Sequence, residues 1–497
     1  MDTGEPLQFD TLPVPAPPDA PLAVELIPAP NPWAVARSLA HLPHLLFLDS
    51  AEEHAERGRY SYVAADPRIT FTQPPRSNAT DGDEGKGRGP FDPLEQVKRR
   101  LRECPLTTVP ELPPFQGGWA GCFGYGYGRS LEHLPPTRYD EFRTPDIVVG
   151  LYDWVFSYDH TSGRAWLVSS GFPFAPGDRS PRAERAVRRL QEALSVIRVR
   201  RPASPVHLPG SAARIDPAPQ YPLPGFSGVT SNFDRAGYEA AVRRAVEYIR
   251  AGDCFQVNLS QRLLAPLREH PLELYDRLRR LNPAPFGGYF DLGDYQILSA
   301  SPERFLRVHP GGEIETRPIK GTRRRGTTPE EDAALVRDLV TSPKDRSENV
   351  MIVDLLRNDI GKVAVFGSVR VPRVCELETF RFVHHLVSEV RGRLKPSTGP
   401  LDLLTASFPG GSVTGAPKVR AMEIIAELEP TARGPYCGAL GWVGFDGAMD
   451  TNILIRTFTA GGGWVQFPVG GGIVADSDPA REYEETLHKA AGLLRSL

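Results

Sequence analysis

Hydrophobic positions recur at helical spacing in several parts of the chain. After Asp234, which can cap a helix, apolar side chains continue on one face as far as Ile249, and Gly252 can end the helix. Pro343 interrupts another periodic stretch, because proline disrupts the interior of a helix. The same spacing predicts further helices over residues 183–196, 329–340 and 348–356.

Other segments show the two-residue period, or the short apolar run, of a β-strand. These patterns predict strands over 59–63, 147–152, 255–263, 295–298 and 313–316. Near the C-terminus, 439–445, 452–459 and 464–469 predict an antiparallel meander with a turn at Gly461–Gly463. Strands and helices do not alternate regularly, which disfavours a doubly wound parallel sheet and favours two layers of sheet with outer helices.

Proline- and glycine-rich stretches divide the chain. Residues 1–22 are expected to be a disordered tail, and residues 73–93 a long surface loop. A linker over 201–228 is expected to separate an N-terminal region, 23–200, from a C-terminal region, 229–497. The candidate motifs concentrate in the C-terminal region.

Composition excludes several classes of function. The 497 residues include 58 basic and 61 acidic ones, so the formal charge of -3 gives no field that would favour nucleic acid or an anionic membrane. The five cysteines form no Cys-x-x-Cys pair. No apolar run could span a bilayer, and the N-terminus lacks the pattern of a signal peptide, so we expect a cytoplasmic protein.

Lys320 stands in the tight sequence Pro318–Thr322, directly after the strand predicted over 313–316. We expect it at the end of that strand, in a turn that faces a cleft. A lysine nucleophile must be neutral, and burial or nearby cations such as Arg317 and Arg323 would lower its pKa. The alternative is a solvated lysine in a basic turn, and spacing alone does not decide between them.

The glycine-rich segment Gly410–Lys418 is expected to open a helix, where free backbone amides could bind an anion. It does not match a P-loop, because Ala416 and Pro417 intervene before Lys418 and no Ser or Thr follows. An ordinary glycine-rich helix cap is the alternative.

Two glutamates are candidate Mg²⁺ ligands. Glu485 lies one helical turn before Lys489, a spacing that also suits a plain surface salt bridge. Glu348 is the candidate second ligand, although it could equally lie on a solvated helix face.

Arg456 is predicted in the middle of a core strand, where it needs an anion: either a buried carboxylate of the protein or a substrate carboxylate. His384 and His385 are adjacent and would face opposite ways on a strand, so they cannot share a metal. His385 could donate to a bound anion or a ketone oxygen.

The order of these motifs resembles that of the chorismate-utilising enzymes. The resemblance covers roughly residues 230 to 490, and it is closest to the component I subunits of aminodeoxychorismate synthase, the sisters of anthranilate synthase component I. In the N-terminal region, Leu45–Ser50 looks like the segment that binds tryptophan in the family, with Ser50 at that site. The matching segments are 255–260, 282–285, 301–305, 318–322, 357–359, 410–418, 450–452 and 470–489.

This resemblance implies an α+β fold of two orthogonally packed antiparallel β-sheets flanked by outer helices and formed jointly by both regions. It implies Mg²⁺ bound by Glu348 and Glu485, an active-site histidine at His385, and an acid at Glu303 that protonates the departing hydroxyl. The positions that match those around the substrate carboxylates are Gly321, Thr322, Ser412, Tyr436, Arg456, Gly470, Gly471, Gly472 and Lys489.

Lys320 separates the two sisters, since anthranilate synthases resemble this motif but carry alanine there. The resemblance therefore implies amination of chorismate at C4 through a covalent lysine intermediate, giving 4-amino-4-deoxychorismate for the 4-aminobenzoate and folate pathway. No segment looks like a glutaminase, so ammonia is expected from a separate glutamine amidotransferase subunit. The alternatives are an anthranilate synthase component I and a non-catalytic regulator that binds chorismate or tryptophan.

Overall fold

The computed structural model describes residues 6–17, 19–52, 57–76, 92–173, 179–199, 215–380 and 383–497. Residues 77–91 of the predicted surface loop and residues 201–214 of the predicted linker lie outside the described residues. One part of the predicted disordered tail is ordered, because residues 10–13 form a strand that pairs with residues 24–27. That prediction is therefore wrong for this segment.

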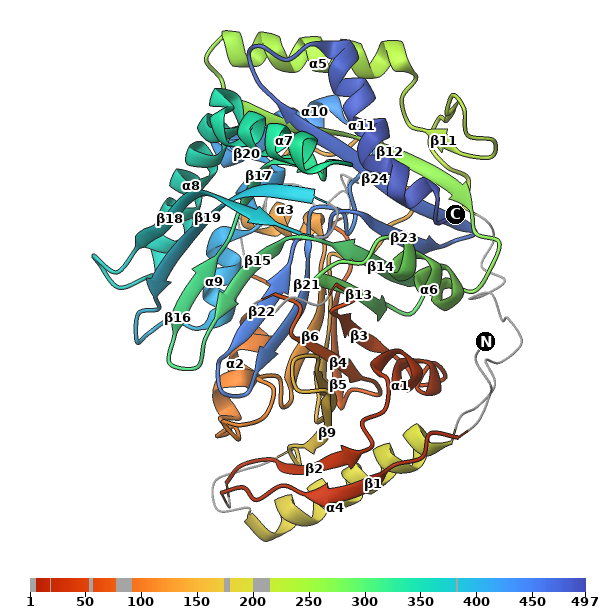
Figure 1. Ribbon diagram of the computed structural model, residues 1–497, viewed down its shortest axis with the longest axis vertical. Coiled ribbons are helices and arrows are strands. Elements are labelled where there is room, and N and C mark those ends of the chain that lie inside the picture. The colour runs from red at the N-terminus through yellow and green to blue at the C-terminus, as the bar shows by residue number, and fades with distance from the viewer. Residues whose placement is uncertain are drawn as a thin grey trace, which may run out of the picture.

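The described strands form two antiparallel sheets, A and B (Figure 1). Sheet A has fourteen strands, in the order β1 (Asp10–Pro13), β2 (Leu22–Ile27), β9 (Arg164–Ser169), β8 (Trp154–Asp159), β4 (Tyr60–Ala64), β3 (Leu46–Asp49), β13 (Phe286–Asp291), β14 (Tyr295–Ser301), β23 (Thr457–Gly461), β24 (Trp464–Ile473), β12 (Gln256–Pro266), β11 (Thr230–Ser231) and β10 (Tyr221–Pro222), with β20 (Gly415–Ala416) beside β12.

Sheet B has ten described strands. Their order is β17 (Ile319–Arg324), β19 (Val383–Arg393), β16 (Glu313–Thr316), β15 (Arg304–Val308), β22 (Met449–Asn452), β21 (Ala439–Gly444), β6 (Gly118–Phe123), β7 (Ile147–Tyr152) and β5 (Ile69–Gln73), with β18 (Arg370–Thr379) paired to β19.

Helices lie outside both sheets (Figure 1). Those beside sheet A are α1 (Pro32–Ser38), α4 (Arg179–Arg198), α5 (Arg235–Arg250), α6 (Pro271–Leu281), α10 (Lys418–Leu428) and α11 (Pro479–Leu494). Those beside sheet B are α2 (Glu95–Glu103), α7 (Pro329–Thr341), α8 (Pro343–Val363) and α9 (Pro400–Ser407). Short helical turns complete the set: η1 (Tyr125–Tyr127), α3 (Gly128–Leu131) and η2 (Gly411–Val413).

The two regions of the chain build both sheets together. In sheet A, β3 of the N-terminal region pairs with β13 of the C-terminal region, and in sheet B β6 pairs with β21. The predicted division at 201–228 therefore does not separate two independent sheets. The predicted α+β fold class, with two orthogonally packed antiparallel sheets between outer helices, is confirmed.

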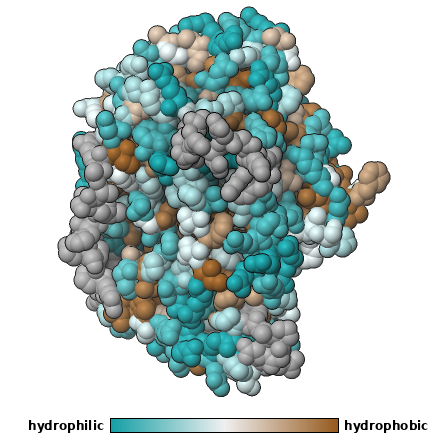
Figure 2. Space-filling view, turned by 180° about the vertical axis from the view of Figure 1, so that it is seen from behind, coloured by the Kyte–Doolittle hydropathy of each residue, from teal (hydrophilic) through white to brown (hydrophobic). Residues whose placement is uncertain are grey.

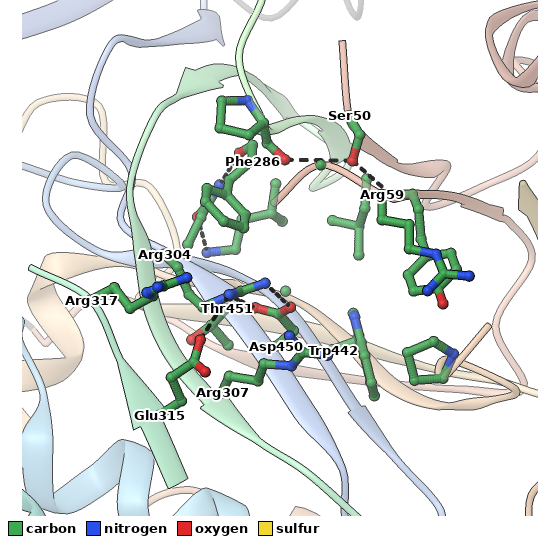
Figure 3. Close-up of a pocket in the computed structure, with 18 of the residues that line it drawn as sticks. Ser50, Arg59, Phe286, Arg304, Arg307, Glu315, Arg317, Trp442, Asp450 and Thr451 are labelled. Carbon is green, nitrogen blue, oxygen red and sulfur yellow. Dashed lines mark hydrogen bonds and ion pairs between the residues drawn. The ribbon is translucent and has the colours of Figure 1, made fainter. Parts of the chain in front are cut away.

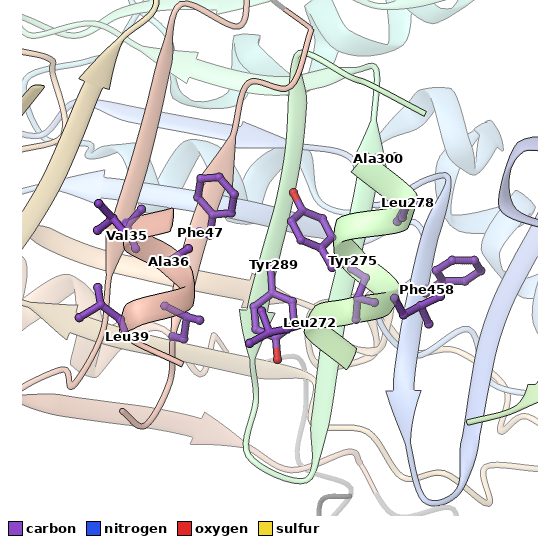
Figure 4. Close-up of a cluster of buried hydrophobic side chains, with 14 of the residues drawn as sticks. Val35, Ala36, Leu39, Phe47, Leu272, Tyr275, Leu278, Tyr289, Ala300 and Phe458 are labelled. Carbon is purple, nitrogen blue, oxygen red and sulfur yellow. The ribbon is translucent and has the colours of Figure 1, made fainter. Parts of the chain in front are cut away.

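Hydrophobic residues fill the space between the sheets and under the helices. The central cluster joins Tyr62 of sheet A to Trp442 of sheet B, whose ring stacks on Phe115 at a centroid distance of 5.0 Å. A second cluster packs α1 and α6 on the outer face of sheet A through side chains such as Val35 and Tyr275 (Figure 4). Removing apolar surface from water stabilises these layers by about 25 cal/mol for each Å² that is buried.

The predicted C-terminal meander is wrong in one respect. The segment predicted as a single strand over 452–459 is two strands, because β22 ends at Asn452 in sheet B and β23 begins at Thr457 in sheet A. The four residues between them carry the chain from one sheet to the other, and Arg456 takes a left-handed conformation with φ of 51°. The sequence did not reveal this change of sheet, because the apolar run Ile453–Ile455 fits the middle of one buried strand as well as a buried connection.

The surface in Figure 2 is mainly hydrophilic, with hydrophobic residues scattered over it. Among the described residues, no helix combines the length and apolar character that crossing a membrane requires.

Candidate active site

Lys320 lies inside a strand, and the expected turn at the end of a strand is wrong. β17 pairs with β19 at Ile319 and again at Thr322, with a shifted register between them. Gly321 adopts φ of 86°, and a Cβ there would lie 2.9 Å from Cδ1 of Leu339. Such a bulge redirects the neighbouring side chain, so it explains why a glycine follows the lysine.

The Lys320 amine is held inside the molecule. Its Nζ donates to the backbone carbonyl of Ser412, 3.1 Å away. Burial lowers the pKa of Lys320, Lys489 lowers it further, and the carboxylates of Glu348 and Glu303 oppose the shift. The net direction favours the free amine.

The arginines around Lys320 do not act as expected from the sequence. Arg317 pairs with Glu389 at 3.1 Å, Arg323 with Asp338 at 2.6 Å, and Arg325 with Asp332 at 2.9 Å. Each positive charge therefore has its own carboxylate, and burial takes over the role that sequence analysis gave to these cations.

Glu303 lies between β14 and β15, close to the lysine. It is only 6% exposed, and burial raises its pKa to about 7, while Lys320, Ser412 and Arg456 oppose the rise. The Ser412 hydroxyl is buried without a hydrogen bond of ordinary geometry to any described residue, although it is near enough to favour the ionised carboxylate. The carboxyl group of Glu303 is therefore close to half protonated at neutral pH, and it lies beside the Lys320 amine.

Arg456 lies near Glu303, at the crossing between the sheets rather than in mid-strand as predicted. Burial lowers its pKa, and the charges of Glu303 and Glu52 oppose this. Arg456 is exposed to solvent although protein surrounds its guanidinium, so the space around Lys320, Glu303 and Arg456 is open to solvent, and we call it the cleft. A guanidinium in this position could bind an anion such as a carboxylate.

His385 is a neutral group beside the bulge. Its Nδ1 lies 2.8 Å from Oγ1 of Thr322, and its ring packs edge-on against Phe380. Burial, helped by the charges of Arg456 and Arg57, lowers its pKa to about 3, so the imidazole is uncharged at physiological pH. His384 faces the other way, toward Thr379 and Asp332.

The glycines of β24 form one wall. Gly470 accepts a hydrogen bond from Nζ of Lys489 at 2.9 Å. A Cβ on Gly471 would lie 3.2 Å from Oε1 of Glu485 and 3.4 Å from Nζ of Lys489, while one on Gly472 would meet the Gln256 side chain at 2.0 Å. Glycine therefore leaves room beside these charged groups.

Glu348 and Glu485 lie around Lys320, and their oxygens suit a hard cation. Oε1 of Glu348 is buried without a hydrogen bond to any described residue, and burial raises the pKa of this carboxyl group. Glu485 pairs with Lys489 at 2.8 Å. No group of three or more His, Cys, Asp or Glu side chains that could hold a metal occurs in the described part of the chain. A Mg²⁺ ion would therefore need water or substrate oxygens as well, which is its usual preference.

Sequence reasoning gave no role to Glu482, which is a neighbour of Glu485. It lies three residues before Glu485 on α11, is 5% exposed, and has a pKa raised by burial and by the charge of Glu485. The spacing of three could have revealed it, because residues three apart share a helix face.

Of two further predicted residues, Ser412 lies beside Lys320 and Glu303, whereas no contact links Tyr436 to either of them among the described residues. Ser412 is in η2, and the loop that contains it is fastened to α8 because Nζ of Lys418 contacts Asp359 at 2.6 Å and the Ser407 carbonyl at 2.6 Å. Lys418 is thus bound internally. Tyr436 is buried, with the Arg433 guanidinium carbon 5.7 Å from its ring centroid.

A separate cavity of about 360 Å³ includes Ser50 (Figure 3). The Ser50 hydroxyl donates to the Tyr60 carbonyl at 2.7 Å. Its lining combines aromatic residues such as Trp442 with charged residues such as Arg304 and Asp450. This combination suits a ligand with both an aromatic and a charged part.

The family model for chorismate binding enzymes matches residues 46–495. Anthranilate synthase component 1 of Thermus thermophilus is 42% identical, covering 94% of this chain and 95% of its own. Aminodeoxychorismate synthase component 1 of Klebsiella aerogenes is 41% identical, covering 92% and 95%.

Solved structures agree in fold. Anthranilate synthase component I from Streptococcus pneumoniae is 32% identical, with a TM-score of 0.71 over 89% of this chain and 93% of its own. The menaquinone-specific isochorismate synthase MenF of Escherichia coli, at 18% identity and a TM-score of 0.68, covers 99% and 95% and supports the fold alone. With its fold and its sequence matched over most of its length, the chain belongs to the chorismate-utilising enzymes.

Proposed function

We propose that the protein is an aminodeoxychorismate synthase component I, which converts chorismate and ammonia to 4-amino-4-deoxychorismate and water. The observation that carries the proposal is Lys320. Its amine lies inside the cleft, its pKa is lowered, and the buried acid Glu303 is beside it. A nucleophile and an acid with these properties suit covalent catalysis.

The reaction proceeds in two displacements. The neutral amine of Lys320 attacks C2, the ring double bonds shift, and the C4–O bond breaks as Glu303 gives its proton to the departing hydroxide, which leaves as water. Ammonia then forms a bond to C4, the double bonds return, and the C2–N bond to lysine breaks. A proton lost by the incoming ammonia restores Glu303, and Lys320 is again a free amine.

Other side chains bind and orient the substrate. Arg456 and Lys489 are cations placed to meet substrate carboxylates, with Gly321, Thr322, Ser412, Tyr436 and the β24 glycines shaping the site. The neutral imidazole of His385 can give a hydrogen bond without adding charge.

Glu348 and Glu485 would hold Mg²⁺. The observation that supports this site is the buried Oε1 of Glu348, which accepts no hydrogen bond from a described residue and has Lys344 Nζ 4.0 Å away. When bound, the ion supplies positive charge that holds the ring carboxylate of chorismate.

Anthranilate synthase component I is the second candidate, because relatives with that name are equally similar to the chain. Lys320 favours C4 amination, since the resemblance places alanine here in anthranilate synthases. A non-catalytic regulator is disfavoured, because lysine, acid and metal carboxylates are all retained.

We further propose that ammonia comes from a separate glutamine amidotransferase subunit, that the product serves the 4-aminobenzoate and folate pathway, and that the enzyme is cytoplasmic.

The product identifies the reaction. With chorismate, Mg²⁺ and an ammonium salt, mass spectrometry should find 4-amino-4-deoxychorismate, and glutamine should replace ammonium only when an amidotransferase subunit is added.

Lys320→Ala should lower C4 amination by at least about 100-fold, because the nucleophile is removed. A trapped adduct should map to Lys320 and not to Lys344, which is exposed on α8. Anthranilate and pyruvate as the only products would overturn the proposal.

Glu303 should set the alkaline side of the pH profile. Glu303 must be protonated and Lys320 neutral at the same time, so kcat/KM for chorismate should fall tenfold per pH unit once the pH exceeds the pKa of both groups, that of Glu303 being about 7. Glu303→Gln should lower kcat by about 10² to 10⁴-fold.

Stability provides the control for Glu303. Its pKa is raised in the folded protein, so its ionisation reduces stability progressively as pH rises from 4.5 to about 7. Glu303→Gln should therefore raise the melting temperature at pH 8 even though it is inactive. An alkaline fall of kcat/KM that is the same in the wild type and in Glu303→Gln would contradict this role.

Mg²⁺ should stabilise the protein through Glu348. Saturating Mg²⁺ should raise the melting temperature of the wild type, and Glu348→Gln should abolish this shift because it removes a charged ligand. Glu103→Gln is the matched control. Glu103 is exposed, and its ion pairs with Arg99 and Arg100 are long, at 3.8 Å and 3.7 Å. An equal shift in all three proteins would place the ion elsewhere.

The Ser50 cavity should bind L-tryptophan. Titration calorimetry should detect binding to the wild type and an affinity about fivefold lower or more for Ser50→Ala, since a buried hydrogen bond is worth about 1 kcal/mol. Ser195→Ala, on the exposed surface of α4, should bind like the wild type. Absence of binding at millimolar tryptophan would remove this ligand from consideration.

A further inference from the structure

Arg433 is a buried cation that the proposed chemistry does not use. It lies between α10 and β21 and is only 6% exposed. Its guanidinium carbon lies 4.8 Å from the ring centroid of Tyr125 and 5.7 Å from that of Tyr436. Two aromatic rings therefore limit where the guanidinium can lie.

The donors of Arg433 are used in four directed bonds. Nε and Nη2 donate to the two carboxylate oxygens of Glu429, at 2.9 and 2.6 Å. Nη1 donates to the Val413 carbonyl at 3.0 Å, and Nη2 also donates to the Asn258 carbonyl at 2.6 Å. A planar fork can make these bonds at once, whereas a lysine ammonium cannot reach all of them.

Glu429 extends the same unit to the central strand of the site. Its Oε1 accepts from the backbone N–H of Ser260 at 2.8 Å and from the Ser260 hydroxyl at 2.9 Å. Ser260 and Asn258 both lie on β12, which pairs with the glycines of β24. The ion pair therefore joins β12, the end of α10 and the loop that contains Val413.

This unit lies directly behind the catalytic lysine. Val413, whose carbonyl Arg433 holds, follows Ser412, whose carbonyl accepts the bond from Nζ of Lys320. The two carbonyls belong to adjacent residues of η2, so a shift of one displaces the other. A misplacement of about 1 Å can cost 100-fold in rate, because reacting groups must be aligned closely.

We propose that Arg433 is a positioning residue: through the Val413 carbonyl it fixes the Ser412 carbonyl, and so sets where the Lys320 amine lies in the cleft. This inference rests on the proposed function, since it concerns the lysine as nucleophile. It deepens that function by assigning a role to a residue that touches neither substrate nor metal.

Arg433→Lys tests whether the several hydrogen bonds of the planar guanidinium are needed. The variant keeps a positive charge for Glu429 but loses bonds to the Val413 and Asn258 carbonyls. We expect kcat to fall about 10- to 100-fold while KM for chorismate stays within about threefold, because alignment is lost rather than binding. Activity is followed as loss of chorismate, so the measurement does not depend on the product.

Arg189→Lys is the matched control. Arg189 on α4 is 7% exposed and donates from Nε to Asp153 at 3.1 Å and from Nη2 to Asp66 at 2.8 Å, so it is a comparable buried ion pair away from the cleft. A purely structural role would make both variants lose stability and activity in parallel. Equal losses of kcat in the two variants at matched melting temperatures would therefore overturn the proposal.

Tyr125 offers a second pair of variants should Arg433→Lys fail to fold. The Tyr125 hydroxyl is buried and makes no hydrogen bond with any described residue, so Tyr125→Phe should retain kcat. Tyr125→Leu removes the ring beside the guanidinium, and we expect kcat to fall about fivefold or more. Identical kcat values for Tyr125→Phe and Tyr125→Leu would contradict positioning through Arg433.

A double-mutant cycle separates this inference from the proposed function. If Arg433 acts through Lys320, adding Arg433→Lys to Lys320→Ala should cause no further loss of the residual chorismate consumption. Additive losses would overturn the positioning role. The proposed function fails separately, through the wild-type product, whatever the outcome of the cycle.

Discussion

The removal of charged groups from water in one cleft governs this structure. Burial destabilises the charged forms of both Lys320 and Glu303, which lowers the pKa of the amine and raises that of the acid to about 7. Each shift brings its group toward the protonation state that nucleophilic attack and proton donation require. The same cost explains why the buried guanidinium of Arg317 is paired with the buried carboxylate of Glu389.

The fold creates this cleft by bringing the two sheets together. Lys320 and His385 come from adjacent strands of sheet B, and Gly470 and Gly471 come from β24 of sheet A. Glu303 and Arg456 belong to two connections between the sheets, which is where polar groups can face an opening rather than a packed core. Residues far apart in the sequence therefore meet because the chain repeatedly crosses between layers.

Local sequence rules predicted most elements well. The helix after Asp234 begins with the expected cap, since the Asp234 carboxylate accepts from the N–H of Gly237 at 2.7 Å, and α7 gives way to α8 at Pro343. The β17 bulge was missed, because Pro318 and Gly321 are typical of a turn as well as of a bulge. The crossing over residues 453–456 was missed, because an apolar run such as Ile453–Ile455 is typical of a buried strand and does not show that the chain changes sheet there.

The sequence by itself determined the fold class, the family and the residue types available for chemistry, because these depend on local periodicity and on the order of motifs. Only the tertiary structure decided how those residues act. It placed the Lys320 amine against the Ser412 carbonyl and raised the pKa of Glu303. It also brought Glu482 beside Glu485 and Arg433 against the Val413 carbonyl. Burial and the distances between charges arise only when distant segments pack together, and protonation states depend on both.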